Sequence, residues 1–424
     1  MGMVATSERD GRRVEGRDEY RSDSAGAHKS SKPAVLHLVD SFNSGGSESQ
    51  AVQLVGMQVK SGRYRVHLAC LNDVGPLRSR IESLSLGEIP EFALNSFYDG
   101  NMMRQLRRFA IHLRRLGITV VHTHDYYTNI FGMMGAWMAR VPVRIASRRE
   151  SSKRAALNRF IERGSYRLAD AVVANCDEVR RQLIAEGVRA DKIVTVHNGL
   201  NLNRVESCEA GRRAALRRLG DSNVRDGETL KFVTIVANIR EVKDHTTFLH
   251  AAARIRAMVP ESAFILAGEG PLLDDMRDLA ATLGLGGRCF FPGRWDEVGD
   301  LLAISDVCVL SSKSEGFSNS VLEYMAARRP VVATNVGGIR EAVREGEFGY
   351  LVSPGDDEAM AARIASLLLD PERARSMGER ARLIVEREFS CEAQLDKTEK
   401  LYERLLAASG RVDLITLRTV EQAN

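Results

Sequence analysis

Short apolar runs alternate with amphipathic stretches along most of the chain. The runs are rich in β-branched residues and bounded by turn residues, which is typical of strands buried on both faces of a parallel sheet. The predicted strands are residues 35–39, 64–71, 119–123, 143–147, 171–174, 193–196, 231–236, 263–267, 288–291, 306–310 and 331–334. The predicted helices include residues 49–60, 101–116, 246–258, 271–283, 298–304 and 321–328. This alternation predicts an α/β fold with two successive, doubly wound parallel sheets.

The pattern also predicts where the parts of the chain begin and end. Residues 1–32 are polar and mixed in charge, which predicts a disordered tail that lacks the apolar segment of a signal peptide. The two sheets would occupy residues 33–205 and 228–390, joined by a charged, arginine-rich segment. Residues 391–410 would form a C-terminal helix that packs back on the first sheet. No apolar run approaches the roughly 20 residues that a membrane-spanning helix needs.

Composition excludes some classes of partner. The 424 residues carry a net charge of +4 and only 6% aromatic residues. This argues against nucleic acid as a partner, because such binding needs a strongly basic face and stacking platforms. Six cysteines are scattered without CxxC spacing. Their spacing argues against a zinc knuckle or a disulfide framework and favours a reducing, cytoplasmic compartment.

Glycine and histidine residues follow two strands of the first predicted sheet. Gly45 and Gly46 stand between a strand and a helix. Such a layout favours phosphate binding at the helix N-terminus, although a plain tight turn explains it equally well. The strand 119–123 carries His122 and delivers His124 to its end, and alternation places both on one face. A lone histidine there is more often structural, but a second one favours function.

A second group of polar residues lies in the second predicted sheet. Glu315 and Glu323, with seven residues between them, follow a buried strand. Glu323 would form a capping box with Ser320, and Glu315 would be a solvated loop residue. Alternatively, both carboxylates accept hydrogen bonds from sugar and ribose hydroxyls. Lys243 and Arg240 follow the strand 231–236 and suit a diphosphate, as a point charge and a planar fork.

These residues resemble the motifs of a known family. The stretch Glu315-Gly-Phe-Ser-Asn-Ser-Val-Leu-Glu323 resembles the E-x7-E signature of the group 1 (family 4) retaining glycosyltransferases. The resemblance extends over most of residues 35–405, including the Gly45–Gly46 turn and the His122–His124 strand. It implies a GT-B fold, in which two Rossmann-like domains face each other across a cleft. The acceptor domain would be N-terminal and the nucleotide-sugar domain C-terminal.

The resemblance also implies roles for individual residues. The catalytic residues would be His124, Lys243 and Glu315. The donor-binding residues would be Gly45, Gly46, Asn238, Arg240, Lys243, Gly268, Gly316, Phe317, Ser318, Asn319 and Glu323. Asn238 stands where the family usually has arginine, and whether Arg240 replaces that contact is open. Asn201 stands where the family has aspartate, and Tyr324 stands where a small residue is common.

The expected reaction follows from the resemblance. A sugar would pass from a nucleoside-diphosphate sugar, with UDP or GDP, to a hydroxyl of a glycan or lipid-linked acceptor, with retention. The product would belong to cell-surface polysaccharide or glycolipid synthesis. We expect no cofactor and no metal, because no DxD motif stands at a strand end. The alternatives are a nucleotide-sugar epimerase or hydrolase of the same fold, or a non-catalytic nucleotide-sugar-binding protein.

Arginine residues crowd two segments of the first half. Arg104, Arg107, Arg108, Arg114 and Arg115 share one face of the predicted helix 101–116, and further arginines lie between Arg140 and Arg167. A helix packed on a sheet with a solvated basic face explains this pattern. The alternative is peripheral contact with an anionic membrane at the inner face of the cytoplasmic membrane, which suits a lipid-linked acceptor.

Overall fold

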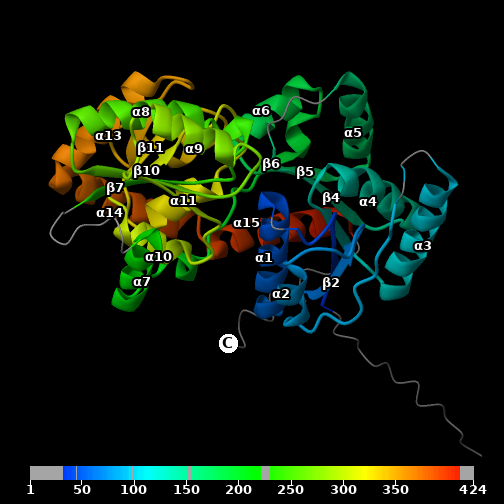
Figure 1. Ribbon diagram of the computed structural model, residues 1–424. Coiled ribbons are helices and arrows are strands. Elements are labelled where there is room, and N and C mark those ends of the chain that lie inside the picture. Colours follow the sequence, from blue (N-terminus) through cyan, green and yellow to red (C-terminus); the bar gives the residue numbers. More distant parts are fainter. Residues whose placement is uncertain are drawn as a thin grey trace, which may run out of the picture. The chain divides into compact units, whose positions relative to one another are not determined.

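The computed structural model describes residues 32–43, 45–94, 96, 99–150, 155–220 and 230–410. The predicted disordered tail, apart from Lys32, lies outside these residues, and so do residues 221–227 of the segment that would join the two sheets. From Lys32 onward the chain forms one compact unit. The domain boundaries therefore stay a prediction, although the chain builds two separate sheets (Figure 1).

The first sheet has six parallel strands in the order β2-β1-β3-β4-β5-β6. The strands are β1 Ala34–Val39, β2 Arg65–Cys70, β3 Val120–Thr123, β4 Val143–Arg148, β5 Ala171–Ala174 and β6 Ile193–Thr195. The associated helices are α1 Gly46–Ser61, α2 Arg78–Glu82, α3 Gly100–Leu116, α4 Tyr126–Ala139, α5 Ala156–Leu168 and α6 Asp177–Ala185. Parallel neighbours end at the same edge, so the residues after β1, β3 and β4 come together.

The second sheet is also parallel and follows the order β12-β11-β10-β7-β8-β9. Its strands are β7 Lys231–Val236, β8 Ser262–Ala267, β9 Cys289–Gly293, β10 Val307–Leu310, β11 Val331–Thr334 and β12 Gly349–Val352. The helices after the first sheet are α7 Glu209–Gly220, α8 His245–Met258, α9 Leu273–Thr282, α10 Val298–Ile304, α11 Asn319–Ala326, α12 Ile339–Ala342, α13 Asp357–Leu369, α14 Pro371–Glu388 and α15 Cys391–Ala408. Short 3-10 turns are η1 Ala190–Lys192, η2 Leu202–Val205 and η3 Glu241–Lys243.

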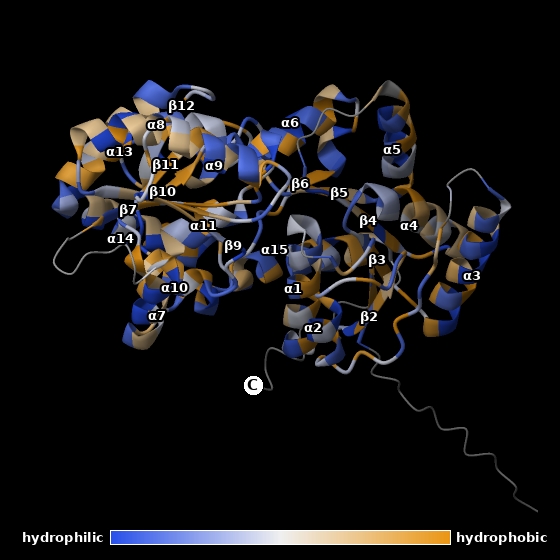
Figure 2. Ribbon diagram, in the orientation of Figure 1, coloured by the Kyte–Doolittle hydropathy of each residue, from blue (hydrophilic) through white to orange (hydrophobic). Residues whose placement is uncertain are grey.

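The hydrophobic pattern explains why the strands are buried and the helices cover them. The strands of the second sheet are apolar and the helices around them are mixed in hydropathy, as Figure 2 shows. Every residue of β3, β5, β10 and β11 is buried, as expected for strands covered on both faces. On α3 the buried side chains Leu106, Phe109 and Leu113 recur at helical spacing, while the arginines face solvent. The predicted α/β fold with two doubly wound sheets is confirmed.

Most strands and helices lie within two or three residues of the predicted bounds. One predicted helix begins earlier, because Gly46 rather than Ser49 opens α1. The sequence pattern did not define α4, α5 and α6. The apolar positions of α5 and α6 are interrupted by polar and basic residues, whereas α4 is apolar over most of its length and lacks an amphipathic stripe. Among the described residues, each helix is too short or too polar to cross a bilayer.

The last helix packs against the first half of the chain. Residues of α15 contact α1 and β4. Glu399 pairs with Arg63 at 2.8 Å, and the hydroxyl of Tyr402 lies 2.6 Å from Nδ1 of His122 in β3. Tyr402 and His122 are both buried. Because burial removes water as an alternative partner, this hydrogen bond ties the end of the chain to the centre of the first sheet.

Removal of the Tyr402 hydroxyl should destabilise the protein. In Tyr402→Phe, Nδ1 of His122 loses its buried partner, and we expect the free energy of unfolding to fall by about 1–3 kcal/mol. Urea denaturation measures it. Lys400→Met on the same helix is the control, because it breaks only an exposed ion pair with Asp396 and should change stability by less than about 0.5 kcal/mol. Equal stability of Tyr402→Phe and wild type would contradict the role of this bond.

Candidate functional site

A cavity of about 310 Å³ lies between the strand ends of the two sheets. The first sheet contributes residues that follow β1, β4, β5 and β6, and the second contributes the loops after β7 and β10. The lining residues are Gly46, Ser47, Arg149, Glu150, Asn175, Asn198, Val242, Lys243, Ser314, Glu315, Gly316, Phe317 and Asn319. The cavity therefore brings together Gly46, Lys243, Glu315, Gly316, Phe317 and Asn319, six of the residues singled out in the sequence.

Lys243 and Glu315 form the charged pair in this cavity. Nζ of Lys243 donates to Oε1 of Glu315 at 2.5 Å, and the Ser312 hydroxyl donates to the same oxygen at 2.6 Å. The Glu315 side chain is only 11% exposed. The interpretation of Glu315 as a solvated loop residue is therefore wrong. Lys243 ends η3, and the backbone carbonyl of this lysine accepts from the Ser311 hydroxyl at 2.9 Å, which fixes η3 beside the β10 loop.

Close backbone approach joins the Glu315–Asn319 loop to the first sheet. A Cβ on Gly316 would lie 2.3 Å from the carbonyl oxygen of Arg149, so only glycine fits. Asn198 completes the contact, since its Nδ2 donates to Oδ1 of Asn319 at 2.9 Å. Behind the loop, Gly337 has a φ of +54° and would place a Cβ 1.9 Å from the carbonyl oxygen of Glu315. Two glycines thus set the position of the loop.

A carboxylate caps a helix across the same contact. Glu341 of α12 accepts from the backbone amides of Asp177 at 2.9 Å and Glu178 at 3.3 Å, at the start of α6. Nε2 of His197 lies 2.8 Å from the other carboxylate oxygen. A helix N-terminus carries unsatisfied amides and partial positive charge, which a carboxylate satisfies. Glu341 therefore links the second half of the chain to α6 of the first.

Glu323 does not form the predicted capping box. The N-cap of α11 is Ser318, and Ser320 lies inside the helix, where its hydroxyl donates to the carbonyl oxygen of Val236 at 2.8 Å. Glu323 is the fifth residue of α11 rather than part of its first turn, and its side chain is buried 3.5 Å from Arg204. Burial raises the pKa of Glu323, and the Arg204 charge opposes the rise.

The Tyr324 side chain forms a buried hydrogen bond in addition to its packing contacts. Its side chain is fully buried, and its hydroxyl accepts from the backbone amide of Val236 at 2.7 Å. This hydrogen bond and that of Ser320 meet at the end of β7, where the loop to Lys243 begins. The two side chains of α11 therefore support the loop that carries the lysine.

His124 belongs to a buried group of three histidines. Nε2 of His124 lies 2.8 Å from Nδ1 of His37, and Nε2 of His37 lies 2.7 Å from Oε1 of Gln58. The rings of His122 and His124 stack with centroids 4.5 Å apart, so the predicted shared face is confirmed. His124 lines a small cavity that also touches Ser47. Its Nδ1 is buried without a partner among the described residues.

These histidines are the described group of His, Cys, Asp and Glu side chains that could hold a metal. One nitrogen from each ring lies within 4.8 Å of the others. However, both nitrogens of His37 lie at hydrogen-bond distance from Gln58 and His124, and those of His122 do so from Tyr402 and Ser147. A metal would have to displace these partners. The hydrogen-bond network explains the group without one.

The remaining predicted donor residues are not among those that line the cavity. Gly45 is the N-cap of α1. Gly268 has a φ of +156° and would place a Cβ 2.0 Å from the carbonyl oxygen of Ala237, so it serves the turn after β8. Asn238 and Arg240 are both exposed. Ser318 accepts no helix amide with its side chain and is buried at the start of α11.

Three residues of the site have no local sequence signal. Arg149 stood in a basic run, Asn198 in a turn and His37 inside an apolar strand. Arg149 and Asn198 line the cavity, and His37 is the partner of His124. Strand register could have found His37, because parallel pairing of β1 with β3 sets His37 beside His122.

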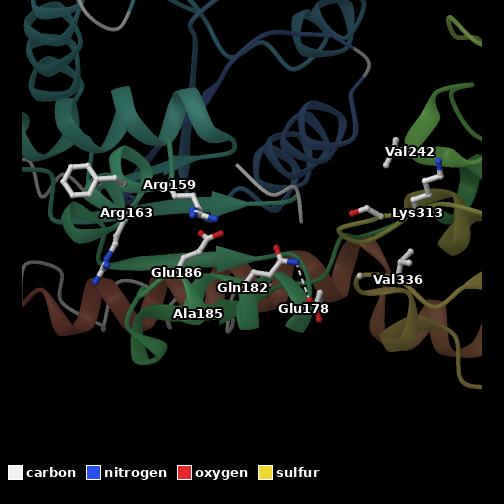
Figure 3. Close-up of a pocket in the computed structure, with 12 residues that line it drawn as sticks. Arg159, Arg163, Glu178, Gln182, Ala185, Glu186, Val242, Lys313 and Val336 are labelled. Atoms are coloured by element: carbon white, nitrogen blue, oxygen red, sulfur yellow. Dashed lines mark hydrogen bonds between the residues drawn. The ribbon is translucent and has the colours of Figure 1, made fainter. Parts of the chain in front are cut away.

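A wider groove adjoins the cavity. It has a volume of about 1210 Å³ and shares Val242 and Ser314 with the smaller cavity. Figure 3 shows Arg159 of α5 and Glu186, just after α6, on one side, with Lys313 and Val336 opposite. The site therefore adjoins a larger space that is lined by basic, acidic and apolar side chains.

Comparisons with known proteins agree with this geometry. The model of the family described as glycosyl transferases group 1 matches residues 222–384, and that of glycosyltransferase family 4 matches residues 44–204. The lipopolysaccharide core biosynthesis glycosyltransferase LpsE of Rhizobium meliloti is 30% identical over 274 residues, which are 64% of this chain and 75% of that protein. The chain belongs to the group 1 glycosyltransferases.

Other relatives of this group 1 glycosyltransferase are matched over a smaller share. N-acetyl-alpha-D-glucosaminyl L-malate synthase of Bacillus anthracis is 36% identical over 179 residues, 42% of this chain. The chain spans about half the length of that relative, 47%. Among solved structures, HepE of Anabaena in complex with UDP superposes with a TM-score of 0.77 at 19% identity, over 88% of this chain and 100% of HepE. That likeness shows the GT-B fold.

Stability of this glycosyltransferase should fall in mild acid because of its histidines. Burial lowers the pKa of His37 from 6.5 to about 4, and it lowers those of His122 and His124 well below 6.5. The unfolded chain then takes up protons between pH 6.5 and 4 that the folded chain does not. For His37 alone this costs about 2 kcal/mol of unfolding free energy between about pH 7.5 and pH 5.

Urea denaturation at the two pH values measures this loss. In His37→Asn the difference between the two pH values should shrink. In His250→Asn, which removes an exposed histidine of α8, it should stay as in wild type. An unchanged pH dependence in His37→Asn would show that this histidine is not buried in its neutral form.

Proposed function

We propose that the protein is a glycosyltransferase that moves a sugar from a nucleoside-diphosphate sugar to a hydroxyl acceptor. One observation carries the proposal: Gly46 of the first half lines the same cavity as Lys243, Glu315 and Asn319 of the second. A volume of about 310 Å³ is at the lower end of ligand pockets. Membership of the group 1 family supports the reaction.

The residues of the lining suit one orientation of the donor. The diphosphate lies at Lys243 and at the amides of Phe317, Ser318 and Asn319, where α11 begins. Glu315 accepts from sugar hydroxyls, and the sugar lies beside Gly46, where the atom nearest to an added Cβ would be Nδ2 of Asn319 at 3.9 Å. Glu323 reaches the ribose only if its side chain turns away from Arg204. A uridine nucleotide is favoured because HepE, of the same fold, is solved with UDP.

The reaction proceeds with retention through attack on the face of the leaving group. The bond between the anomeric carbon and the β-phosphate oxygen breaks, and the acceptor oxygen forms the new bond on the same side. The acceptor's proton passes to the leaving phosphate. Lys243 stabilises the charge that develops on that phosphate, and the α11 amides do the same. We assign His124 to a position beside the sugar; its Nδ1, which is buried without a described partner, supports this role. Such a mechanism needs no metal.

The acceptor is a hydroxyl of a glycan or lipid in cell-surface polysaccharide or glycolipid synthesis. The likeness to LpsE, which by its name acts in lipopolysaccharide core synthesis, supports this class. The wide groove lined by Arg159, Phe160 and Lys313 gives such an acceptor access to the cavity. The protein would work in the cytoplasm, at the membrane face where lipid-linked acceptors are held.

Hydrolysis of nucleotide sugars tests the donor without knowledge of the acceptor. Wild type should release sugar from one nucleoside-diphosphate sugar among UDP and GDP donors. Lys243→Met should lower kcat/KM by about 100-fold, because the leaving phosphate loses its cation. Lys397→Met, an exposed lysine on α15, is the matched control and should behave as wild type.

Three results would count against the proposal. Wild type that neither binds nor hydrolyses any donor would exclude a nucleotide-sugar site. If a folded Lys243→Met variant keeps full activity, Lys243 does not belong to the nucleotide-sugar site. An epimerised donor recovered without transfer to any acceptor would favour the epimerase alternative.

Contact with an anionic membrane is the second part of the proposal. The five arginines of α3 are exposed, and Ile111 is 62% exposed among them. On α5, Leu157 and Phe160 are exposed beside Arg159 and Arg163. Basic side chains next to exposed apolar ones suit the headgroup region of an anionic bilayer.

Vesicle sedimentation at low salt tests this contact. Wild type should bind phosphatidylglycerol vesicles at least about tenfold more tightly than phosphatidylcholine vesicles, since each cation near the surface contributes about 1 kcal/mol. The triple variant Arg104→Gln, Arg107→Gln, Arg115→Gln should lose most of that preference. The matched control replaces Arg212, Arg213 and Arg217 of α7 by glutamine and should keep it. Equal binding of wild type to both vesicles would refute membrane contact.

A further inference from the structure

Two adjacent arginines at the end of β4 have different surroundings. Arg148, the last residue of the strand, is fully buried, and both of its terminal nitrogens donate to the carboxylate of Glu186. Its charge is thus matched inside the first half of the chain. Arg149 follows directly and lies in the lining of the cavity between the two sheets. No described carboxylate lies within ion-pair distance of Arg149.

The backbone of Arg149 is held in place from both halves. Its carbonyl oxygen accepts from Nδ2 of Asn175 at 2.8 Å, and the backbone of Gly316 packs directly on this carbonyl. The Arg149 side chain is therefore attached to a backbone position that is fixed at the contact between the two halves. A side chain with a fixed origin and a planar donor group is well suited to bind a ligand in one orientation.

One N–H donor of the Arg149 guanidinium has no acceptor among the described residues. Nη1 donates to Oδ1 of Asn198 at 2.8 Å, and Nε is buried without a partner among the described residues. A buried N–H without an acceptor is costly, and most native structures avoid it. Burial also lowers the pKa of Arg149 to about 10, so the group is still charged at neutral pH.

The other charges of the lining leave this cation unmatched. Lys243 is paired with Glu315, and the remaining carboxylate, Glu150, has an exposed side chain and forms no ion pair with Arg149. Arg149 is half-buried, and a partly desolvated charge without a counter-ion is stabilised when an anion binds beside it. Two parallel N–H donors match the oxygens of a phosphate or carboxylate, which a lysine cannot do as well.

We propose that Arg149 is an anion-binding residue that the first half contributes to the cavity, where its guanidinium binds phosphate or carboxylate oxygens of a bound substrate. The proposal rests on the proposed function, because that function supplies the anion. The anion is either the diphosphate of the donor or an acidic group of the acceptor. The exposed positions of Asn238 and Arg240 leave Arg149 as the arginine in this lining.

Titration calorimetry with UDP tests the first source. Arg149→Gln should bind UDP at least about tenfold more weakly than wild type, and Arg149→Lys should recover only part of the loss, since it keeps the charge but not the fork. Arg213→Gln, which removes one exposed charge on α7, is the matched control and should bind as wild type. Thermal melts establish that each variant is folded, and Arg149→Lys serves if the glutamine variant is not.

Titration of inorganic phosphate and L-malate into the UDP-saturated protein tests the second source. If the acceptor supplies the anion, Arg149→Gln keeps its affinity for UDP but loses at least about tenfold in affinity for one of these anions. If the affinities for UDP, phosphate and malate are all unchanged in a folded Arg149→Gln, the proposal is overturned.

The outcome also separates this proposal from the proposed function. If wild type binds phosphate through Arg149 but binds no nucleotide sugar, the anion site is supported and a nucleotide-sugar donor is excluded. If wild type binds UDP and no affinity changes in Arg149→Gln, the donor site is supported and the role of Arg149 is excluded. Wild type that binds none of the anions would exclude both.

Discussion

The site depends on one close contact, in which the Glu315–Asn319 loop lies against the backbone after β4. Gly316 makes it possible, because any side chain there would overlap the carbonyl of Arg149. Gly337 supports the loop from behind by the same means. Because the contact involves backbone atoms of both halves, it sets the distance between the two strand edges. The positions of Lys243, Glu315 and Gly46 around one cavity follow from it.

Polar groups at this contact are satisfied across it. Glu341 satisfies the N-terminal amides of α6, and Asn198 joins Arg149 to Asn319. If the halves moved apart, water would have to replace each of these partners. Since protein–protein hydrogen bonds gain only about 0.5–1.5 kcal/mol each over those with water, a few such contacts favour the closed arrangement without making it permanent.

The sequence predicts the fold well because the signals are local. An apolar run such as Val331–Thr334 and a helical stripe such as that of α3 are visible within a dozen residues. Glu315 and Lys243 were also recognised, since both stand at strand ends next to glycine or helix signals. The capping box failed because the hydroxyl of Ser320 is used by Val236, which lies 84 positions away. Local spacing cannot report such a competitor.

The residues that sequence reasoning missed are those whose meaning comes from the other half of the chain. Arg148 and Arg149 are indistinguishable in the sequence, yet one is neutralised by Glu186 and the other faces Gly316 and Lys243 across the contact. Arg148 is the last residue of β4 and is buried in the first half, where Glu186 matches its charge, whereas Arg149 lies beyond the strand in the lining of the cavity. A carboxylate partner in that lining would compete with a substrate anion. An arginine without a carboxylate partner at that position is therefore consistent with binding, and a purely structural role would favour a paired one.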